Sequence, residues 1–299
     1  MKNLIVLLGS TGIGKTELSI SLAKTLGAPI ISADSRQIYK EIPIGTAAPS
    51  ITERQAVPHY FVGTKSVFDY YSASMYEQDV LNLLDELFLT YDNVILTGGS
   101  MMYIDAVCKG MDDIPDVDPI IRKSLYERYD SEGLSLIAEE LKLLDPVYYE
   151  KVDKSNYKRV IHAIEICLTT GKPFSSFHNN AFVARPFNII KVGLWRERKE
   201  LYDRINARVL KMIDHGLVSE ACAMYPFRDL NALNTVGFKE IFEYFDGDIS
   251  LDEAVSKIQK NTRVYARKQQ TWWKRDADIV WFPPEDSHAI VEHITQHIR

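Results

Sequence analysis

The sequence predicts an α/β fold in which helices surround a mostly parallel sheet, with an all-helical domain inserted into the chain. Two patterns carry this prediction. Short apolar runs rich in β-branched residues alternate with longer segments of helical spacing, which is typical of parallel sheets. Between the third and the fourth run, residues 116–186 contain amphipathic segments and no good strand candidate.

Five runs are predicted as strands because they are apolar and of strand length. They are NLIVLLG (3–9), APIISAD (28–34), DNVILTG (92–98), NIIKVGLW (188–195) and ADIVWF (277–282). Residues 196–275 are predicted to be helical. Their apolar positions recur every three or four residues, as in LYDRINARVLKMIDHGLVSEA.

The predicted domains are a core, made of 1–115 and 187–299, and a helical insertion, 116–186. The insertion contains the amphipathic segments IIRKSLYERY, SLIAEELKLL and NYKRVIHAIEICLTT. Prolines punctuate it and its borders at Pro115, Pro119, Pro146, Pro173 and Pro186. We therefore expect several short helices there.

Composition indicates a cytoplasmic enzyme without a membrane segment. The chain has 299 residues, of which 46% are hydrophobic and 25% charged, and no apolar run approaches the roughly 20 residues of a membrane helix. Its cysteines, Cys108, Cys167 and Cys222, are far apart, which favours free thiols in a reducing compartment. The net charge of −6 argues against indiscriminate nucleic-acid binding, yet 256–275 holds seven Lys/Arg and no Asp or Glu.

A glycine-rich loop between the first predicted strand and a predicted helix has the pattern G-x-x-x-x-G-K-T. Such a loop turns its N–H groups around phosphates, and the helix that follows adds its positive end. The residues predicted to bind a diphosphate here are Gly9, Ser10, Thr11, Gly12, Ile13, Gly14, Lys15 and Thr16. Lys15 supplies a positive charge and Thr16 a hydroxyl for Mg²⁺. The core is therefore predicted to resemble a P-loop NTPase.

The acidic residue that a P-loop enzyme needs follows the second predicted strand. The third run ends in TGGS without a carboxylate, whereas the second ends in Asp34. Because the ends of parallel strands face one crevice, Asp34 is expected beside the bound phosphates. Some small-molecule kinases have the same arrangement, so these positions alone do not separate a kinase from another transferase.

Taken together, these motifs resemble those of the tRNA dimethylallyltransferases (isopentenyltransferases) of the bacterial type. Nine matching stretches run in family order from residue 9 to 275, and they include GSTGIGKT, DSRQIY, LTGGSMMYI, LYDRINARV, TVGFKE and TRVYARKQQTWWKR. The resemblance implies that the glycine loop binds dimethylallyl diphosphate rather than ATP. It further implies prenyl transfer to N6 of the adenosine immediately 3′ of the anticodon, with Mg²⁺, by a monomer.

The resemblance also implies roles for single residues. Asp34 matches the general base that takes the N6 proton, and Ser100 stands where the family usually has Thr and keeps a hydroxyl beside the amine. Arg159 and Arg208 match arginines that reach the diphosphate or the catalytic centre. Without the resemblance, either arginine would be interpreted as an ordinary helix-surface residue.

Action on a folded tRNA requires that the adenine leave its stack and enter a pocket. The pocket and its surroundings are predicted to contact tRNA through Asp34, Ser35, Arg36, Gln37, Ser100, Arg122, Lys158, Arg159, Asn234, Thr235, Gly237, Phe238, Lys239, Arg263, Arg267 and Lys268. The helical insertion is expected to grip the anticodon stem-loop from one side and the basic run 256–275 from the other. The adjacent Trp272 and Trp273 are expected in the core.

The chain departs from the family pattern at a few positions. Ser10 replaces a Pro, Met101 and Met102 replace smaller residues, and His162 stands where Arg is common. The loop VPHYFVG lacks the family's second His and its Asp, so no chemistry is assigned to it. No zinc finger of the eukaryotic kind follows residue 275.

Three other functions compete with this interpretation. A P-loop kinase would transfer phosphate from ATP and has no use for so large an insertion. An adenylate isopentenyltransferase shares the glycine loop and Asp34 but needs neither the insertion nor the basic run. A non-catalytic RNA-binding module leaves the glycine loop and Asp34 unexplained.

Overall fold

The computed structural model describes residues 2–112, 114–178 and 183–298, and the chain forms two compact units. Residues 1–109 and 184–299 make the first unit, and residues 110–183 make the second. The insertion predicted from the sequence, 116–186, begins and ends a few residues later than this second unit. Each unit is described by itself.

The first unit is built on a parallel sheet with the strand order β3-β2-β4-β1-β5-β6. The strands are β1 (Asn3–Gly9), β2 (Ile30–Ser32), β3 (His59–Tyr60), β4 (Asn93–Gly98), β5 (Asn188–Leu194) and β6 (Val280–Phe282). The predicted α/β class with a mostly parallel sheet is confirmed. Strand β3 was not predicted, because two residues are too few to show a strand pattern.

Nine helices of the first unit lie within the described residues. They are α1 (Lys15–Leu26), α2 (Ile51–Ala56), α3 (Ala73–Leu87), α4 (Met101–Lys109), α9 (Arg198–Asp214), α10 (Leu217–Met224), α11 (Phe238–Phe245), α12 (Leu251–Trp273) and α13 (Ser287–His297). Short 3₁₀ turns, η2 (Tyr225–Phe227) and η3 (Asn231–Leu233), connect α10 to α11. The prediction of helices over 196–275 agrees with α9 to α12.

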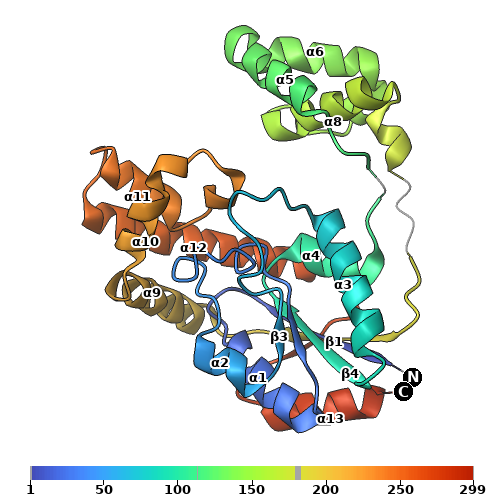
Figure 1. The fold of residues 1–299 in the computed structure, drawn as a ribbon, viewed down its shortest axis with the longest axis vertical. Coiled ribbons are helices and arrows are strands. Elements are labelled where there is room, and N and C mark those ends of the chain that lie inside the picture. Colours follow the sequence, from blue (N-terminus) through green and yellow to red (C-terminus); the bar gives the residue numbers. More distant parts are fainter. Residues whose placement is uncertain (1, 113, 179–182, 299) are drawn as a thin grey trace. The chain divides into compact units, whose positions relative to one another are not determined.

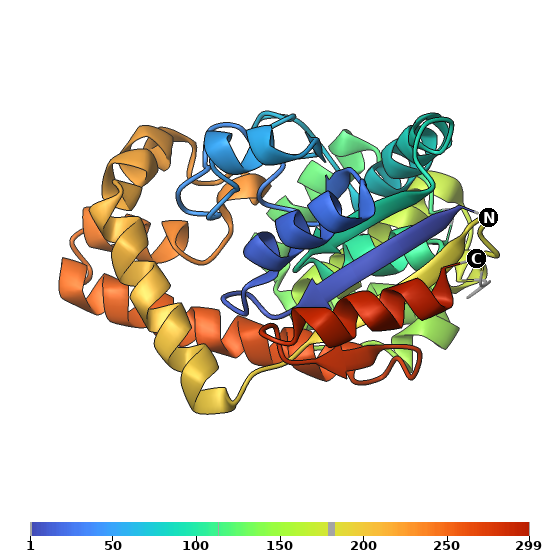
Figure 2. The same ribbon diagram turned by 90° about the horizontal axis from the view of Figure 1, so that it is seen from below.

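Both faces of the sheet are covered by helices, as a parallel sheet requires. Leu4, Val6 and Leu8 of β1 pack with α3 and α4, whereas Ile5 and Leu7 pack with α1 and α13. Figure 1 and Figure 2 show these helix pairs on opposite sides of the strands. This burial on both faces explains why the sequence of β1 is a continuous apolar run and does not alternate between apolar and polar residues.

Helices α9 to α12 form a further layer beside the carboxyl ends of the strands, with a core of their own around Phe238. The longest of them, α12, begins at a capping box in which Ser250 and Glu253 satisfy each other's backbone N–H groups. Trp273 near its end is 2% exposed, and Trp272 donates a hydrogen bond from Nε1 to Asp105. Both tryptophans are therefore anchored in the fold, as expected.

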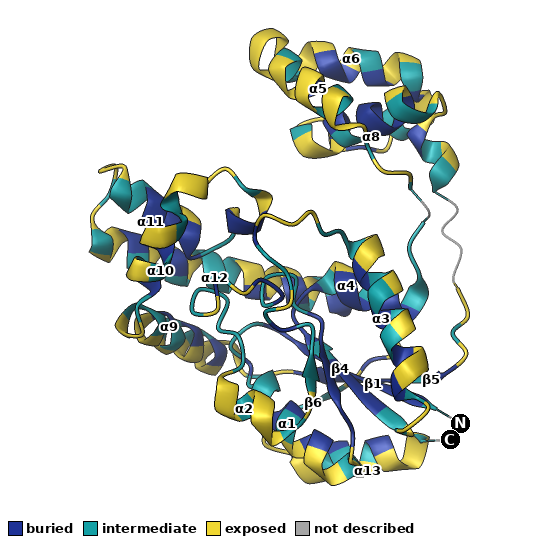
Figure 3. Ribbon diagram, in the orientation of Figure 1, coloured by how far each residue is buried: buried dark blue, intermediate teal, exposed yellow. Residues whose placement is uncertain are grey.

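The described part of the second unit contains helices and loops and no strand. It contains α5 (Pro119–Glu132), α6 (Leu134–Leu144), α7 (Pro146–Tyr149), α8 (Tyr157–Thr170) and the 3₁₀ turn η1 (Phe174–Phe177). Its buried residues form a core separate from those of the first unit, and Figure 3 shows them on the facing sides of α6 and α8. Within the described ranges of both units, no helix combines the length and the apolar character needed to cross a membrane.

Candidate active site

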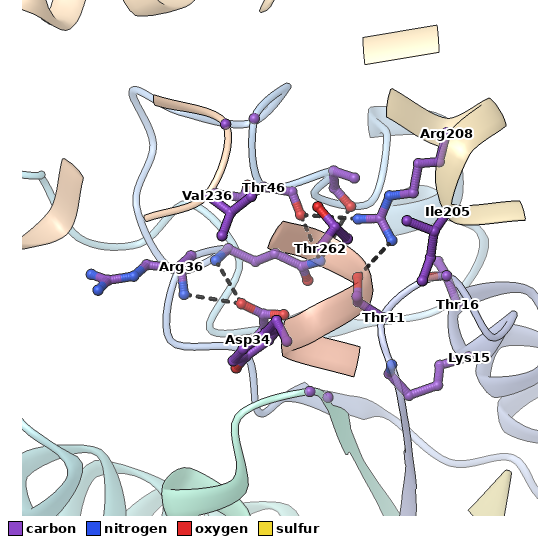
Figure 4. Close-up of a pocket in the computed structure, with 18 of the residues that line it drawn as sticks. Thr11, Lys15, Thr16, Asp34, Arg36, Thr46, Ile205, Arg208, Val236 and Thr262 are labelled. Atoms are coloured by element: carbon purple, nitrogen blue, oxygen red, sulfur yellow. Dashed lines mark hydrogen bonds between the residues drawn. The ribbon is translucent and has the colours of Figure 1, made fainter. Parts of the chain in front are cut away.

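A cavity of about 910 Å³ opens at the carboxyl ends of the strands in the first unit. Its walls come from the glycine loop, the turn after β2, the end of β4, helix α9, the segment before α11 and helix α12. Figure 4 shows side chains from these segments pointing into one space. Segments that are far apart in the sequence therefore converge on a single site.

The glycine loop connects β1 to α1 and needs glycine for two physical reasons. Gly12 and Gly14 have φ angles of +79° and +110°, in the left-handed region that other residues rarely adopt. A Cβ atom on Gly12 would also lie 2.9 Å from Cγ1 of Ile205 on α9. Residues 11–16 line the cavity, whereas Ser10 is fully buried beneath the loop.

Two cationic side chains lie partly buried at this loop. Lys15 donates hydrogen bonds from Nζ to the carbonyl oxygens of Gly9 and Ser10, at 2.7 and 2.9 Å. Burial lowers the pKa of Lys15 to about 7, although Asp34 raises it in part and Arg208 lowers it further. Burial likewise lowers the pKa of Arg208, against the opposing influence of Asp34. An anion between them would relieve this cost of burial.

Asp34 lies two residues after β2 and is held by its own turn. Its Oδ1 accepts hydrogen bonds from the backbone N–H groups of Arg36 and Gln37, at 3.0 and 3.3 Å. The side chain lines the cavity, and the structure shows no hydrogen bond from the described residues to Oδ2. Asp34 therefore has a fixed carboxylate with one oxygen available to a substrate proton.

Ser100 ties the end of β4 to the turn that carries Asp34. Its Oγ accepts a hydrogen bond from the backbone N–H of Ser35 at 2.7 Å and donates to Oγ of Ser35 at 2.9 Å. The approach is close because Gly98 has no side chain, and a Cβ there would lie 2.0 Å from the carbonyl oxygen of Ala33. The Gly-Gly-Ser sequence thus joins two neighbouring strand ends.

Arg208 reaches the glycine loop from α9. It donates from Nη1 to Oγ1 of Thr11 at 3.3 Å and from Nη2 to the carbonyl oxygen of Thr46 at 3.4 Å. Gln37 donates from Nε2 to the carbonyl oxygens of Thr46 and Ala47, at 3.3 and 3.2 Å. The 46–47 segment therefore connects Arg208 with the turn that carries Asp34.

Most of the residues predicted between 234 and 239 lie at the same cavity. Its walls include Asn234, Thr235, Gly237 and Lys239. Phe238 differs, because its side chain is 0% exposed and packs in the core around α11, so it offers no surface to RNA. The buried Glu240 fixes this segment by accepting hydrogen bonds from Gly237 N–H and from Nδ2 of Asn261, at 2.8 and 2.7 Å.

The predicted basic residues of α12 have different surroundings. Lys268 lines the cavity. Arg263 donates a hydrogen bond to Oδ1 of Asn206, and Arg267 donates to the hydroxyl of Tyr202 at 3.2 Å. Both arginines are thus held against α9 by neutral partners.

Three predicted residues belong to the second unit, and their contacts with substrate remain predictions. Arg122 forms a bidentate ion pair with the buried Glu165, with distances of 2.9 and 3.3 Å, and His162 contacts the same carboxylate at 3.2 Å. Lys158 and Arg159 are exposed in the first turn of α8.

Gln269 is among the residues at the site that were not predicted from the sequence. Gln269 of α12 is 0% exposed and forms hydrogen bonds with both the glycine loop and the end of β4. The sequence contained a signal for it, because Ile258, Ala266 and Trp273 mark the buried stripe of α12 and Gln269 falls on that stripe. A polar residue on an apolar stripe needs partners.

The donor set fits Mg²⁺ that is held largely by a substrate. Among the described residues, no group of three or more His, Cys, Asp or Glu side chains could hold a metal ion. Mg²⁺ commonly binds through one or two protein oxygens together with substrate phosphates and water. Thr16, in the first turn of α1 and at the cavity, offers such an oxygen.

Comparison with known proteins agrees with this geometry. The family model described as IPP transferase matches residues 37–276. A protein named tRNA dimethylallyltransferase 2 from Porphyromonas gingivalis is 65% identical over 288 residues, which cover 96% of both chains. Another of that name from Parabacteroides distasonis is 60% identical over 298 residues, with full coverage of both chains.

Solved structures give the same result. The tRNA isopentenylpyrophosphate transferase of Bacillus halodurans superposes with a TM-score of 0.73 at 32% identity, covering 100% of this chain and 97% of that one. A eukaryotic dimethylallyltransferase acting on tRNA gives a TM-score of 0.80 at 25% identity, covering 95% of this chain and 74% of that one. The family model and these relatives show that the chain belongs to the IPP transferase family.

Proposed function

We propose that this enzyme transfers the dimethylallyl group of dimethylallyl diphosphate to N6 of the adenosine 3′ of the anticodon in tRNA and releases diphosphate. One observation carries the proposal. Lys15 and Arg208, both partly buried, and the carboxylate of Asp34 lie at the same cavity. A leaving anion and an amine that must lose a proton need this combination of groups.

The donor is bound at the glycine loop. Lys15 and Arg208 neutralise the diphosphate, and the N-terminus of α1 adds the positive end of its dipole. When Mg²⁺ is bound through Thr16, it supplies further neutralisation of the diphosphate oxygens. As the bond between the prenyl carbon and the diphosphate oxygen breaks, its electron pair leaves with the diphosphate.

The acceptor adenine enters from the side of Asp34. The N6 lone pair is delocalised into the purine, so the amine attacks well only as its proton is removed. The new bond joins N6 to the prenyl carbon, and the N6 proton passes to Asp34. Ser100 holds the turn of Asp34 through Ser35 and thereby fixes the direction of the carboxylate.

The RNA is bound by surfaces around this cavity. The adenine is extruded into the space lined by residues 34–37 and 234–239. Lys268 at the cavity and the arginines of α12 contact phosphates, and the helical insertion grips the anticodon stem-loop. This division of roles explains why the acidic chain contains one long helix whose second half has no acidic residue.

The relatives named tRNA dimethylallyltransferase, which match nearly the whole chain, argue against the kinase alternative. The end of β4, where Thr97 to Ser100 include no carboxylate, does not by itself separate a kinase from another transferase. Incubation with labelled dimethylallyl diphosphate and either tRNA or AMP tests all the alternatives together. Label on tRNA is expected. Label on AMP alone would favour an adenylate transferase, and ATP hydrolysis without prenyl transfer would favour a kinase.

A further inference from the structure

The buried amide of Gln269 connects the donor side of the cavity to the acceptor side. Its Oε1 accepts a hydrogen bond from the backbone N–H of Thr11 at 2.9 Å, and its Nε2 donates to the carbonyl oxygen of Gly99 at 2.7 Å. One turn earlier on α12, the carbonyl oxygen of Ala266 accepts a hydrogen bond from Oγ of Ser10 at 3.2 Å. Helix α12 thus contacts the glycine loop twice and the end of β4 once.

The two partners of this amide lead directly to reacting groups. Thr11 contacts Arg208 through its hydroxyl, so it belongs to the diphosphate side. Gly99 precedes Ser100, whose hydroxyl holds the turn that carries Asp34. Gln269 therefore links, through two hydrogen bonds, the loop that holds the leaving group and the end of β4, where Ser100 in turn holds the turn that carries the base.

The two hydrogen-bond partners explain why a glutamine suits position 269. Thr11 presents a donor and Gly99 presents an acceptor, so the partner between them must offer one acceptor and one donor on a rigid plane. The space is also tight, because a Cβ on residue 99 would lie 2.7 Å from Nε2 of Gln269. The second glycine of Gly98-Gly99 is needed for this contact.

We infer that Gln269 is a positioning residue for prenyl transfer, whose amide fixes the separation between the diphosphate loop and the strand end that carries the acceptor-side groups. The inference rests on the proposed function. A misplacement of about 1 Å between reacting groups can cost roughly 10²-fold in rate, even when each substrate still binds. Gln269 should therefore affect the transfer step much more than it affects donor affinity.

The test compares Gln269→Met, which removes both hydrogen bonds at similar volume, with Gln269→Glu, which keeps an acceptor for Thr11 but opposes the Gly99 carbonyl oxygen. The matched control is Gln270→Met, the neighbouring glutamine on the same helix. For each protein, single-turnover transfer is measured at saturating donor and tRNA, and the Kd of inorganic diphosphate with Mg²⁺ is measured separately. Circular dichroism and thermal melting establish that the variants are folded.

We expect both Gln269 variants to transfer about 10²-fold more slowly than the parent, with a diphosphate Kd within about threefold, and the control to match the parent. A folded variant that transfers at the parental rate overturns the inference. So does a variant whose rate and diphosphate affinity fall in parallel, because Gln269 would then support only the glycine loop. If Gln269→Met does not fold, the transfer rate and the diphosphate Kd of Gln269→Glu test the inference by themselves. If the parent itself transfers no label to tRNA, the proposed function fails instead.

Discussion

At the scale of single residues, burial disfavours the charged forms of Lys15 and Arg208 when no substrate is bound. Asp34 is the residue whose chemistry can be isolated most cleanly. Asp34→Asn keeps the size and one acceptor oxygen but cannot take a proton at neutral pH. Because general-base catalysis contributes about 10²–10⁴ in rate, single-turnover transfer should slow by that factor. Dissociation constants for tRNA and for the donor should change little.

Asp85→Asn provides a control for this substitution, because Asp85 is an exposed carboxylate on α3. Transfer within a few-fold of the parent would show that Asp34 only caps its turn. A joint collapse of transfer and tRNA affinity would show that it mainly holds RNA. Only a large loss of rate with binding preserved supports its role as the base.

Lys15 predicts a pH dependence of donor binding. Its pKa is about 7 in the free site because burial disfavours the charged form. A bound diphosphate favours the charged form, so binding takes up a proton above pH 7. Affinity for diphosphate should therefore fall as pH rises from 7 to 9, by at most about tenfold per pH unit, and level off below pH 7.

Titration calorimetry of diphosphate binding in two buffers with different ionisation enthalpies measures this proton uptake. Lys15→Arg is the control, because a guanidinium remains charged over the whole range and removes this contribution. Subtracting the Lys15→Arg profile also removes the titration of the ligand itself. Identical pH profiles for the two proteins would show that Lys15 is already charged in the free site.

At the scale of secondary-structure elements, the joint between β2 and β4 determines where the base lies. Gly98→Ala would place a Cβ 2.0 Å from the carbonyl oxygen of Ala33, and that oxygen belongs to backbone that cannot simply rotate away. Overpacking of this kind typically costs 1–3 kcal/mol, and we expect a loss near or above about 3 kcal/mol here. Transfer should fall as well, because the ends of the two strands must separate.

Gly27→Ala is the matched control, measured by urea unfolding alongside Gly98→Ala. Gly27 caps α1 with a φ of +58°, and nothing lies within 4 Å of an added Cβ. Its cost should be about 1 kcal/mol from the left-handed conformation alone. Gly98 has no positive φ, so a loss no larger than that of Gly27→Ala would show that the contact with Ala33 relaxes at little cost.

Local patterns explain what could be predicted about these elements. Five of the strands were visible because each is an apolar run, and the helices were visible through their spacing. Strand β3 was missed because His59 and Tyr60 join the sheet through pairing with β2, which no local pattern encodes. Gln269 was missed for a related reason, since its partners at Thr11 and Gly99 lie far away in the sequence.

At the scale of the whole molecule, the notable feature is a net negative protein that must bind a polyanion. Residues 256–275 carry seven Lys/Arg without an acidic residue, and Lys158 and Arg159 of the second unit are exposed. The cavity of the first unit is lined by residues of that unit. The second unit is therefore expected to contribute to tRNA binding.

The salt dependence of tRNA binding tests this expectation in the full chain. Each phosphate that a protein neutralises adds about 0.7–0.9 to the slope of log affinity against log salt. Lys158→Ala combined with Arg159→Ala should weaken tRNA binding at low salt and reduce the magnitude of that slope by about 1.5. The matched control is Lys142→Ala on α6, which lies in the same unit and contacts Glu139.

The same double variant separates the two roles predicted for Arg159. If Arg159 serves only tRNA, the Kd of diphosphate with Mg²⁺ stays at the parental value in the presence and in the absence of tRNA. If Arg159 reaches the diphosphate, that Kd rises, and the rise should be larger when tRNA is present and the two units engage one substrate. An unchanged salt slope together with an unchanged diphosphate Kd would show that this turn of α8 is a solvated surface. The contacts with RNA phosphates would then be assigned to α12 alone.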